Sequence, residues 1–307
     1  MKKTLSNLAV LLGVFGAVGT HASEAAGAEN RTPWLNGPPD EIGPNYKSWR
    51  MVSDPAPGDH SNAPVLVQSA SATPGPQERG VVEIATGMNY WDGQQWSPSD
   101  ASFELTDDSF VANRVQHRTR LSADLNVVGA VTTTLRDGTT LRSTPVAIAL
   151  YDPNDGRFAV ISDFTNSVGV LVASNRVVYP DAFRGGVCAD VIYTLKQGSF
   201  EQDVVITGRL NPVDYGFPTN SQIQVITEFY DPPQPEKMRR PVYVEQKESV
   251  RRGKVSPDLM DEVLGFGELV IGTGRAFTPP TATHTNGTQT VVAKEFMTIQ
   301  GRTFLIR

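Results

Sequence analysis

Short runs of hydrophobic and β-branched residues, separated by turn signals, dominate the chain from Val81 to Phe229. The turn signals include Asp137-Gly138 and Gly185-Gly186. Runs of this length are typical of β-strands, and no long stretch has the 3.6-residue period of a helix that would accompany parallel βαβ units. The pattern therefore predicts an all-β fold, an antiparallel β-sandwich. The runs are 81–86, 126–135, 145–151, 157–164, 168–173, 187–195, 200–207 and 222–230.

One hairpin can be aligned residue by residue. If Gln197-Gly198 is a two-residue turn, Lys196 faces Ser199, and the register of the whole hairpin follows. A shift by one residue would move the apolar side chains to the other face of the sheet, so their match fixes the register. In this register three pairs of apolar residues face each other on one side of the sheet: Leu195 with Phe200, Val191 with Val204 and Ala189 with Ile206.

The segments before and after the main sandwich, which we place at 81–230, differ in composition. Residues 23–80 are rich in Pro, Gly, Ser and Ala, which predicts an extended leader with few elements of its own. Trp34 and Trp49 within it indicate that parts of the leader pack onto the following domain, because a disordered tether seldom carries tryptophan. Residues 231–255 form a Pro-rich, basic connection, whose charges fit a solvated face better than the alternative, a site for an anionic ligand.

Residues 256–307 are expected either to complete the same sheet or to form a small satellite. Ser256-Pro257-Asp258 has the residue types of an N-cap, a first-turn proline and an acidic first turn. This signal predicts one short helix near 257–264. Strands are expected near 266–272, 289–299 and 302–306.

The first residues have the layout of a secretory signal peptide. Lys2 and Lys3 precede an apolar stretch from Leu5 to Val18, and Thr20-His21-Ala22 fits a small-x-small cleavage site. A single-span anchor is the alternative, but about 14 apolar residues fall short of the ~20 that cross a bilayer. We therefore expect residues 1–22 to be removed, no later transmembrane segment, and an exported protein in the periplasm, on the cell surface or outside the cell.

Composition narrows the classes of partner and chemistry. The 307 residues carry a formal net charge of −6, and this excess of acid argues against nucleic acid as a partner. Cys188 is the only cysteine, so no internal disulfide can form, and its strand-like setting predicts a buried, unreactive thiol. The sequence lacks H-E-x-x-H, G-x-S-x-G, P-loop and paired C-x-x-C motifs. It therefore predicts no catalytic residue, no metal site and no cofactor.

An aromatic cluster is the first candidate for binding chemistry. Tyr90, Trp91 and Trp96 flank Asp92-Gly93, which as a two-residue turn would set Asn89 opposite Trp96 and leave Trp91 at the turn. Rings presented in this way could stack on sugars. Cross-strand packing that covers the sheet explains them as well.

Three carboxylates form the second candidate: Asp190, Glu201 and Asp203. In the hairpin register above, Asp190 and Asp203 are diagonal neighbours on one face, with Cα atoms about 7–8 Å apart. Such a pair suits a glycosidase or a calcium ion, and solvated carboxylates bonded to nearby groups are the alternative. Asp152-Pro153-Asn154-Asp155-Gly156 resembles a calcium loop only in part and fits an ordinary β-turn.

A family resemblance lies at residues 178–206, which begin Val178-Tyr179-Pro180-Asp181-Ala182-Phe183 and end Asp203-Val204-Val205-Ile206. This stretch resembles a β-rich region in the N-terminal part of large exported bacterial proteins, some of which continue into rearrangement-hotspot/YD-type repeats. The similarity extends over roughly 80–307. It implies a secreted, β-sandwich-like region without defined catalytic residues.

These observations lead to two hypotheses of function. The first is an exported, non-enzymatic structural or binding module of the bacterial cell surface or extracellular space, with a protein or glycan partner. The alternative is a carbohydrate-binding or carbohydrate-active β-sandwich. It requires a groove that holds the aromatic rings together with the carboxylates. Its speculative ligand-binding residues are Tyr90, Trp91, Trp96, Asp190, Glu201 and Asp203.

Overall fold

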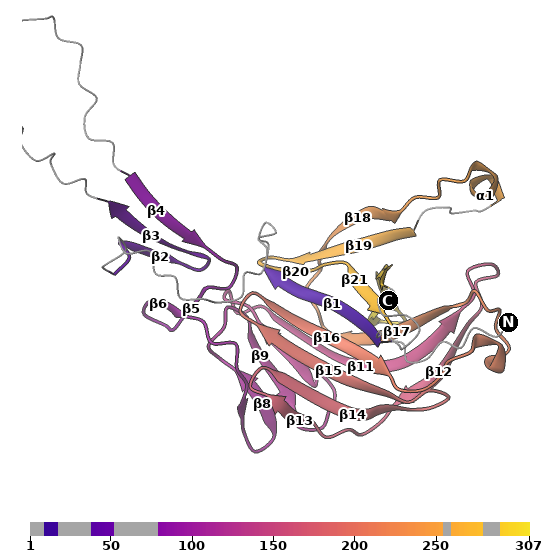
Figure 1. Cartoon of the computed structure of the whole chain (residues 1–307). Helices are drawn as coiled ribbons and strands as arrows, with labels where there is room; N and C mark the ends of the chain where they lie inside the picture. The colour runs from indigo at the N-terminus through magenta and orange to yellow at the C-terminus, as the bar shows by residue number, and fades with distance from the viewer. Residues whose placement is uncertain (1–8, 18–37, 52–78, 254–258, 279–288) are drawn as a thin grey trace, which may run out of the picture.

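The computed structural model describes residues 9–17, 38–51, 79–253, 259–278 and 289–307. Within these ranges the protein is built from antiparallel strands, which confirms the predicted all-β, sandwich-like fold. Figure 1 shows β14, β15, β16 and β1 following one another across the molecule, with the β18–β19 hairpin beyond them.

One large sheet and two small sheets contain the described strands. The small sheets are β2 (Glu41–Gly43), β3 (Tyr46–Met51) and β4 (Arg79–Ile84), and β5 (Asn89–Trp91) with β6 (Trp96–Pro98). The first half of the large sheet contains β1 (Ala9–Ala17), β7 (Glu104–Leu105), β8 (Ser109–Ala112), β9 (Arg118–Ser122), β10 (Val131–Thr134), β11 (Thr140–Tyr151), β12 (Phe158–Phe164), β13 (Val170–Ala173), β14 (Arg176–Gly185), β15 (Ala189–Lys196) and β16 (Ser199–Ile206).

The second half of the large sheet comes from the C-terminal third of the chain. A 3₁₀ helix, η1 (Pro212–Tyr215), precedes it, and the α-helix α1 (Glu248–Gly253) interrupts it. Its strands are β17 (Gln222–Tyr230), β18 (Glu236–Tyr243), β19 (Leu259–Phe266), β20 (Leu269–Ile271), β21 (Gly274–Phe277), β22 (Gln289–Val292), β23 (Glu295–Ile299) and β24 (Arg302–Ile306).

Strand β11 connects the two halves. One edge pairs with β17 from Arg142 to Tyr151. The other edge pairs first with β10 and then with β12. The register shifts between Pro145 and Ala147, and this irregularity accommodates a residue that has no N–H to donate. The strand begins at Thr140, earlier than the predicted start at 145, because Pro145 does not end the pairing.

The β15–β16 hairpin has the predicted register. Lys196 pairs with Ser199, and Asp190 lies opposite Val205. The side chains of Tyr193 and Phe200 from this hairpin stack with ring centroids 5.4 Å apart, inside the main core. Tyr179 of β14 meets Tyr193 edge to face at 5.9 Å. The alternation seen in the sequence thus places the largest side chains of these strands on the core side.

Strand β1 comes from the apolar stretch predicted to be a signal peptide. Its backbone pairs with β16 on one side and with β20 and β21 on the other. The strand therefore lies between the middle of the large sheet and its C-terminal strands, as Figure 1 shows.

The predicted position of the helix is wrong. Residues 259–264 belong to β19, which pairs with both β18 and β20, and the α-helix lies earlier, in α1. Ser256-Pro257-Asp258, which carried the helix signal, lies outside the described residues. Asp261, Leu264 and Phe266 are buried in the pairing with the neighbouring strands. Tertiary pairing has overridden a local capping signal here.

The structure also differs from the expectations for Cys188 and for the segments on either side of the main sandwich. Cys188 is exposed rather than buried, because Val187 and Ala189 take the core side and alternation turns the thiol outward. The segment 231–255, predicted as a connection, contains β18 and α1. Within the predicted leader, β2, β3 and the start of β4 form a small sheet that includes Trp49, and Trp34 lies outside the described residues.

The C-terminal strands join the large sheet through polar as well as apolar contacts. Arg302 of β24 donates two hydrogen bonds of 2.6 Å to the Glu228 carboxylate of β17. Deeper in the fold, the Lys294 Nζ lies 2.9 Å from an oxygen of Asp261. The two side chains are only 1% and 0% exposed. The second pair ties β19 to the residues between β22 and β23.

Asp261→Asn is expected to destabilise the protein by about 3–5 kcal/mol, because it leaves the buried Lys294 ammonium without its counter-charge. Urea unfolding of the full chain measures this loss. Glu248→Gln is the matched control, since Glu248 and Arg252 form an exposed pair in α1, and its cost is expected to stay below about 0.5 kcal/mol. Equal losses in the two variants would contradict the role assigned to the buried pair.

Candidate functional site

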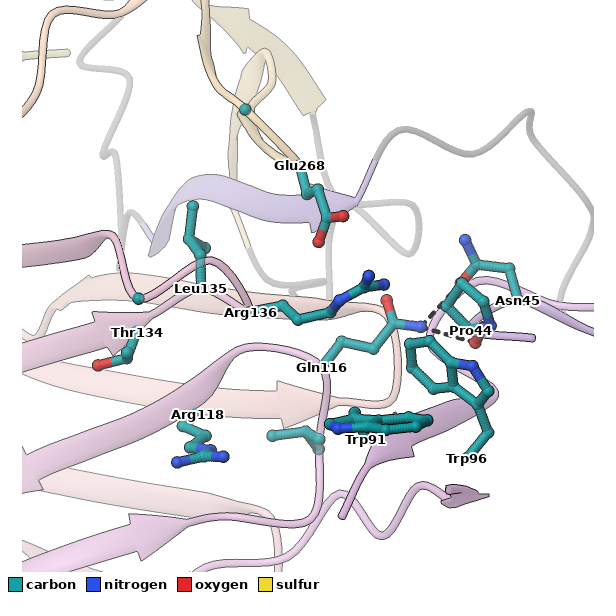
Figure 2. A pocket seen from close by; sticks show the side chains of 13 residues that line it. Pro44, Asn45, Trp91, Trp96, Gln116, Arg118, Thr134, Leu135, Arg136 and Glu268 are labelled. Atoms are coloured by element: carbon teal, nitrogen blue, oxygen red, sulfur yellow. Dashed lines mark hydrogen bonds between the residues drawn. The ribbon is translucent and has the colours of Figure 1, made fainter. Parts of the chain in front are cut away.

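An open cleft beside the β5–β6 hairpin is the best candidate for a site. Its volume is about 370 Å³, within the ~300–1,000 Å³ of small-molecule sites. Figure 2 shows Trp91, Trp96 and Gln116 together at one end, and Arg136 and Glu268 extending toward them. The lining residues are Pro44, Asn45, Trp91, Trp96, Val115, Gln116, Arg118, Thr134, Leu135, Arg136, Gly138, Gly267 and Glu268.

The hairpin that carries the tryptophans differs from its predicted register. Trp91 pairs directly with Trp96, and Asn89 pairs with Pro98, so the loop contains four residues rather than two. The Asp92 carboxylate explains this loop, because it accepts hydrogen bonds of 2.9 Å from the backbone N–H groups of both Gln94 and Gln95. These bonds also lower the pKa of Asp92. An Asx-type turn has replaced the tight Asp-Gly turn.

The direct pairing brings the two indole rings into contact. Their centroids lie 5.4 Å apart in an edge-to-face arrangement. Trp91 is 41% exposed, Trp96 is partly buried, and the Arg136 guanidinium lies 5.2 Å from the centroid of the Trp96 ring. The rings therefore support each other as a cross-strand pair, and the exposed face of Trp91 remains open to a ligand. Tyr90, the third aromatic candidate, is partly buried on the same hairpin and does not line the cleft.

Gln116 fixes the wall of the cleft. Its Nε2 donates hydrogen bonds to the Pro44 carbonyl at 2.6 Å and to the Asn45 Oδ1 at 3.0 Å (Figure 2). The same Nε2 also donates to the Asn89 carbonyl at 3.0 Å. The buried Asn89 in turn donates to the Gly43 carbonyl at 2.8 Å. These bonds join the small β2–β3–β4 sheet to the β5–β6 hairpin and to the bend between β8 and β9, so that the cleft is held by three parts of the fold.

The charged groups of the cleft are two arginines and one carboxylate. Arg118 and Arg136 are exposed at the start of β9 and after β10, and the exposed Glu268 lies in the turn between β19 and β20. Among the lining residues of the described chain, Glu268 is the only acid. The balance of the lining is therefore positive, in contrast to the acidic chain as a whole.

The three candidate carboxylates of the sequence do not line this cleft. The Asp190 Oδ1 accepts a hydrogen bond of 2.8 Å from the backbone N–H of Asp181, where β14 bends. Glu201 pairs with Lys196 at 2.9 Å. Asp203 is diagonal to Asp190 in the predicted register, and its Oδ1 is buried with no hydrogen-bond partner among the described residues. The structure thus does not bring the rings and the carboxylates into one groove, so the carbohydrate hypothesis fails in the form that requires both, and a glycan site at this cleft would have to rest on the tryptophans without these acids.

Burial, reinforced by the negative charge of Glu201 and opposed by Arg176 and Lys196, raises the pKa of Asp203 to about 7. Because the folded state holds this proton at pH values where the unfolded chain has released it, the protein loses stability as the pH rises from about 4 to 7. The Asp203 carboxylate therefore lowers the stability of the folded protein at neutral pH.

Metal binding receives no support from the described residues. In these parts of the chain no group of three or more His, Cys, Asp and Glu side chains is placed to hold an ion. The Asp152 loop is a β-turn in which the Asp152 Oδ1 accepts from the Asn154 N–H at 2.9 Å. No helix in the described ranges is long and apolar enough to cross a membrane.

Sequence reasoning missed the polar half of the cleft. Gln116, Arg118 and Glu268 lie in no motif, and they meet only because β9 and the β19–β20 turn approach the hairpin in the folded chain. Arg136 alone had a local signal, since it precedes the Asp137-Gly138 turn. Comparison with known proteins gives no further guide, because no family model, curated protein or solved structure matches the chain.

Asp203→Asn is expected to stabilise the full-length protein by about 1–3 kcal/mol at pH 8, because it removes a partly buried charge, and to have little effect near pH 4.5. Urea unfolding at the two pH values tests this difference. Asp190→Asn serves as the control, since Asp190 keeps a backbone partner and no pH-dependent gain is expected. A gain of the same size at both pH values would show that the Asp203 charge is not responsible.

Proposed function

We propose that the protein is an exported, non-enzymatic binding module, and that the cleft at Trp91 and Trp96 is its glycan-binding site. The observation that carries the proposal is the exposed face of Trp91 within an open cleft whose wall is held by hydrogen bonds of Gln116. An exposed tryptophan in such a setting offers a flat apolar surface to the C–H face of a sugar ring. Beside it, Gln116 and Asn45 use their Nε2 and Oδ1 atoms to hold the wall, which leaves the Gln116 Oε1 and the Asn45 Nδ2 for a ligand.

Binding is favoured over hydrolysis by the distribution of acids. Glycoside hydrolysis normally uses two carboxyl groups, about 5 to 9.5 Å apart, on either side of the scissile bond. Glu268 is the single acid among the lining residues, while Asp190, Glu201 and Asp203 belong to other surroundings. The cleft therefore has the groups of a lectin-like site and lacks the pair that a glycosidase needs.

The charges of the cleft favour an acidic glycan as the ligand. Arg118 and Arg136 are exposed, and arginine recognises carboxylates through two parallel hydrogen bonds. Arg136 is already oriented by its contact with the Trp96 ring, which reduces the entropy it loses on binding. A uronic acid could stack on Trp91 while its carboxylate meets this arginine.

Export is supported by the N-terminal sequence and by the resemblance to exported bacterial surface proteins. Lys2, Lys3 and the apolar stretch that follows have the order of a signal peptide. Cleavage before Ser23 would also remove β1 and expose the edges of β16 and β20 that it covers. The location outside the cytoplasm is where polysaccharides of the cell surface are found.

Binding to polygalacturonate, with dextran as the neutral comparison, tests the glycan site by isothermal titration calorimetry. We expect Trp91→Ala to weaken polygalacturonate binding at least 10-fold, and Arg136→Ala to weaken it about 3- to 10-fold and to reduce its dependence on salt. The matched controls are Tyr243→Ala and Arg251→Ala, exposed residues of β18 and α1 outside the cleft, which are expected to bind like the wild type.

Each outcome has a distinct meaning. Binding of dextran and polygalacturonate with equal affinity would remove the role of the arginines and leave the tryptophan site. Polygalacturonate binding that survives Trp91→Ala, or the absence of binding to either glycan by the folded protein, would overturn the proposed site. Release of reducing sugar ends would contradict the non-enzymatic assignment.

Export predicts a defined N-terminus. When the full-length chain is produced in a bacterium, intact-mass measurement of the exported fraction should show loss of residues 1–22 and a chain that begins at Ser23. An exported or cell-retained product that keeps residues 9–17 in the folded domain would contradict this part of the proposal. The glycan site would stand or fall independently.

A further inference from the structure

The backbone of β1 is paired along both of its edges. On one side it pairs antiparallel with β16, from Ala9 opposite Val205 to Gly16 opposite Ser199. On the other side it pairs with β21 near its start and with β20 near its end. Figure 1 shows β1 lying between β16 and these two C-terminal strands. The place that β1 fills, which we call the β1 position, is therefore bounded by two strand edges that belong to the rest of the chain.

Both flanking edges depend on β1 for their pairing. Within the described part of the chain, β16 pairs with β15, β20 with β19 and β21 with β22 on their opposite edges, and β1 is their partner on the edges that face it. In an antiparallel sheet about half of the backbone groups of a strand point toward a given neighbour. Without β1 these N–H and C=O groups lose their hydrogen bonds, which costs free energy unless another strand replaces it.

The register defines where a strand in the β1 position must be apolar. The positions of Val10 and Phe15 lie opposite residues of the main core on both sides. These core residues are Val204 and Ala276 for the first position, and Phe200 and Ile271 for the second. Residues directly opposite each other in antiparallel strands share one face of the sheet, so apolar side chains are required at both positions. The register shift between Leu12 and Val14 explains their spacing of five residues.

The position of Leu11 makes a different demand. It lies opposite Asp203 of β16 and Arg275 of β21, and neither residue belongs to the hydrophobic core. A polar side chain is therefore acceptable at this position. Proline is not acceptable there, because the strand is paired on both sides at Leu11 and proline has no N–H to donate.

We propose that in the exported protein the β1 position accepts an extended apolar segment of a partner protein, which joins the sheet antiparallel to β16. The inference rests on the export part of the proposed function, because removal of residues 1–22 empties this position. Main-chain hydrogen bonds supply the affinity of such strand addition, and the positions that face the core supply its specificity. The segment seated there in the full-length chain shows the chemistry that fits, a strand of 9 residues with apolar residues at the two core positions.

A strand-exchange experiment tests the proposal with every residue present during folding. The full-length protein is made with a protease recognition site within residues 19–25, folded, and then cut, so that β1 stays bound by non-covalent contacts alone. A fluorescent peptide with the sequence of residues 7–18 is added in excess, and its anisotropy reports entry into the protein. We expect the cut protein to bind this peptide at least 10-fold more tightly than the uncut protein, whose β1 is held at high effective concentration.

Three peptide variants separate strand addition from non-specific adhesion. Phe15→Ser is expected to weaken binding at least 10-fold, because this position faces the core on both sides. Leu11→Ser is the matched control, with an expected change of less than about 3-fold, since its position lies on the other face. Leu11→Pro should weaken binding at least 10-fold, because it also removes the backbone donor.

Hydrogen–deuterium exchange of the cut protein supplies a second measurement. After the cut fragment is washed away, amides in residues 199–206 and 269–277 should exchange faster, and the peptide should restore their protection. Persistent protection without peptide would overturn the partner assignment: a monomer would show that another segment of this chain fills the position, and a dimer that a second copy does.

The remaining outcomes are equally decisive. Equal binding of all four peptides, equal binding to cut and uncut protein, or failure of the peptide to replace the cut fragment would overturn the proposal. If the protein unfolds once the fragment is washed away, the exchange experiment still decides, because the β1 position is never empty in it. Retention of residues 1–22 by the exported protein would contradict export alone, since binding to the cut protein is measured separately.

Discussion

Backbone hydrogen bonding by β11 is the constraint on which the rest of the structure depends. Its two edges pair with β17 on one side and with β10 and β12 on the other, so it joins the N-terminal and C-terminal halves of the large sheet, which β1 joins a second time through its pairing with β16, β20 and β21. Ile148 and Leu150 place their side chains in the core with 0% exposure. The buried Thr144 hydroxyl donates to the Val127 carbonyl at 2.8 Å and so anchors the turn before β10. Buried strands with both edges paired are expected to be the last to open.

The tryptophan cleft and the β1 position both follow from that arrangement. The tryptophan cleft forms at the end of the sheet where β9 and β10 meet the small β5–β6 hairpin, and the β19–β20 turn contributes Glu268 from the C-terminal part of the chain. The β1 position lies between β16 on one side and β20 and β21 on the other. Both lie between segments distant in sequence, and the tryptophan cleft is lined mainly by the short turns and bends that connect the strands. Their side chains are thereby held in place before a ligand arrives, which reduces the entropic cost of binding.

The sequence predicted what depends on local pattern. The alternation of apolar residues and the Gln197-Gly198 turn determined the β15–β16 register, because a shift by one residue would have turned Val191 and Val204 away from the core. The same reasoning failed at Asp92-Gly93, where the Asp92 carboxylate bonds to two backbone N–H groups and stabilises a longer loop. It failed again at 259–264, where pairing with β18 and β20 outweighs a helix-capping signal. The polar half of the cleft could not be predicted, since Gln116 and Glu268 become neighbours only through the topology.

The glycan site is tested most directly by hydrogen–deuterium exchange of the full-length protein with and without polygalacturonate. The account predicts slower exchange of backbone amides in residues 89–97, 115–118 and 135–138, the segments that contain the lining residues Trp91, Trp96, Gln116, Arg118 and Arg136. The edges of β18 and the α1 helix should exchange at unchanged rates. Protection confined to other parts of the chain, or exchange that polygalacturonate leaves unchanged throughout, would contradict it.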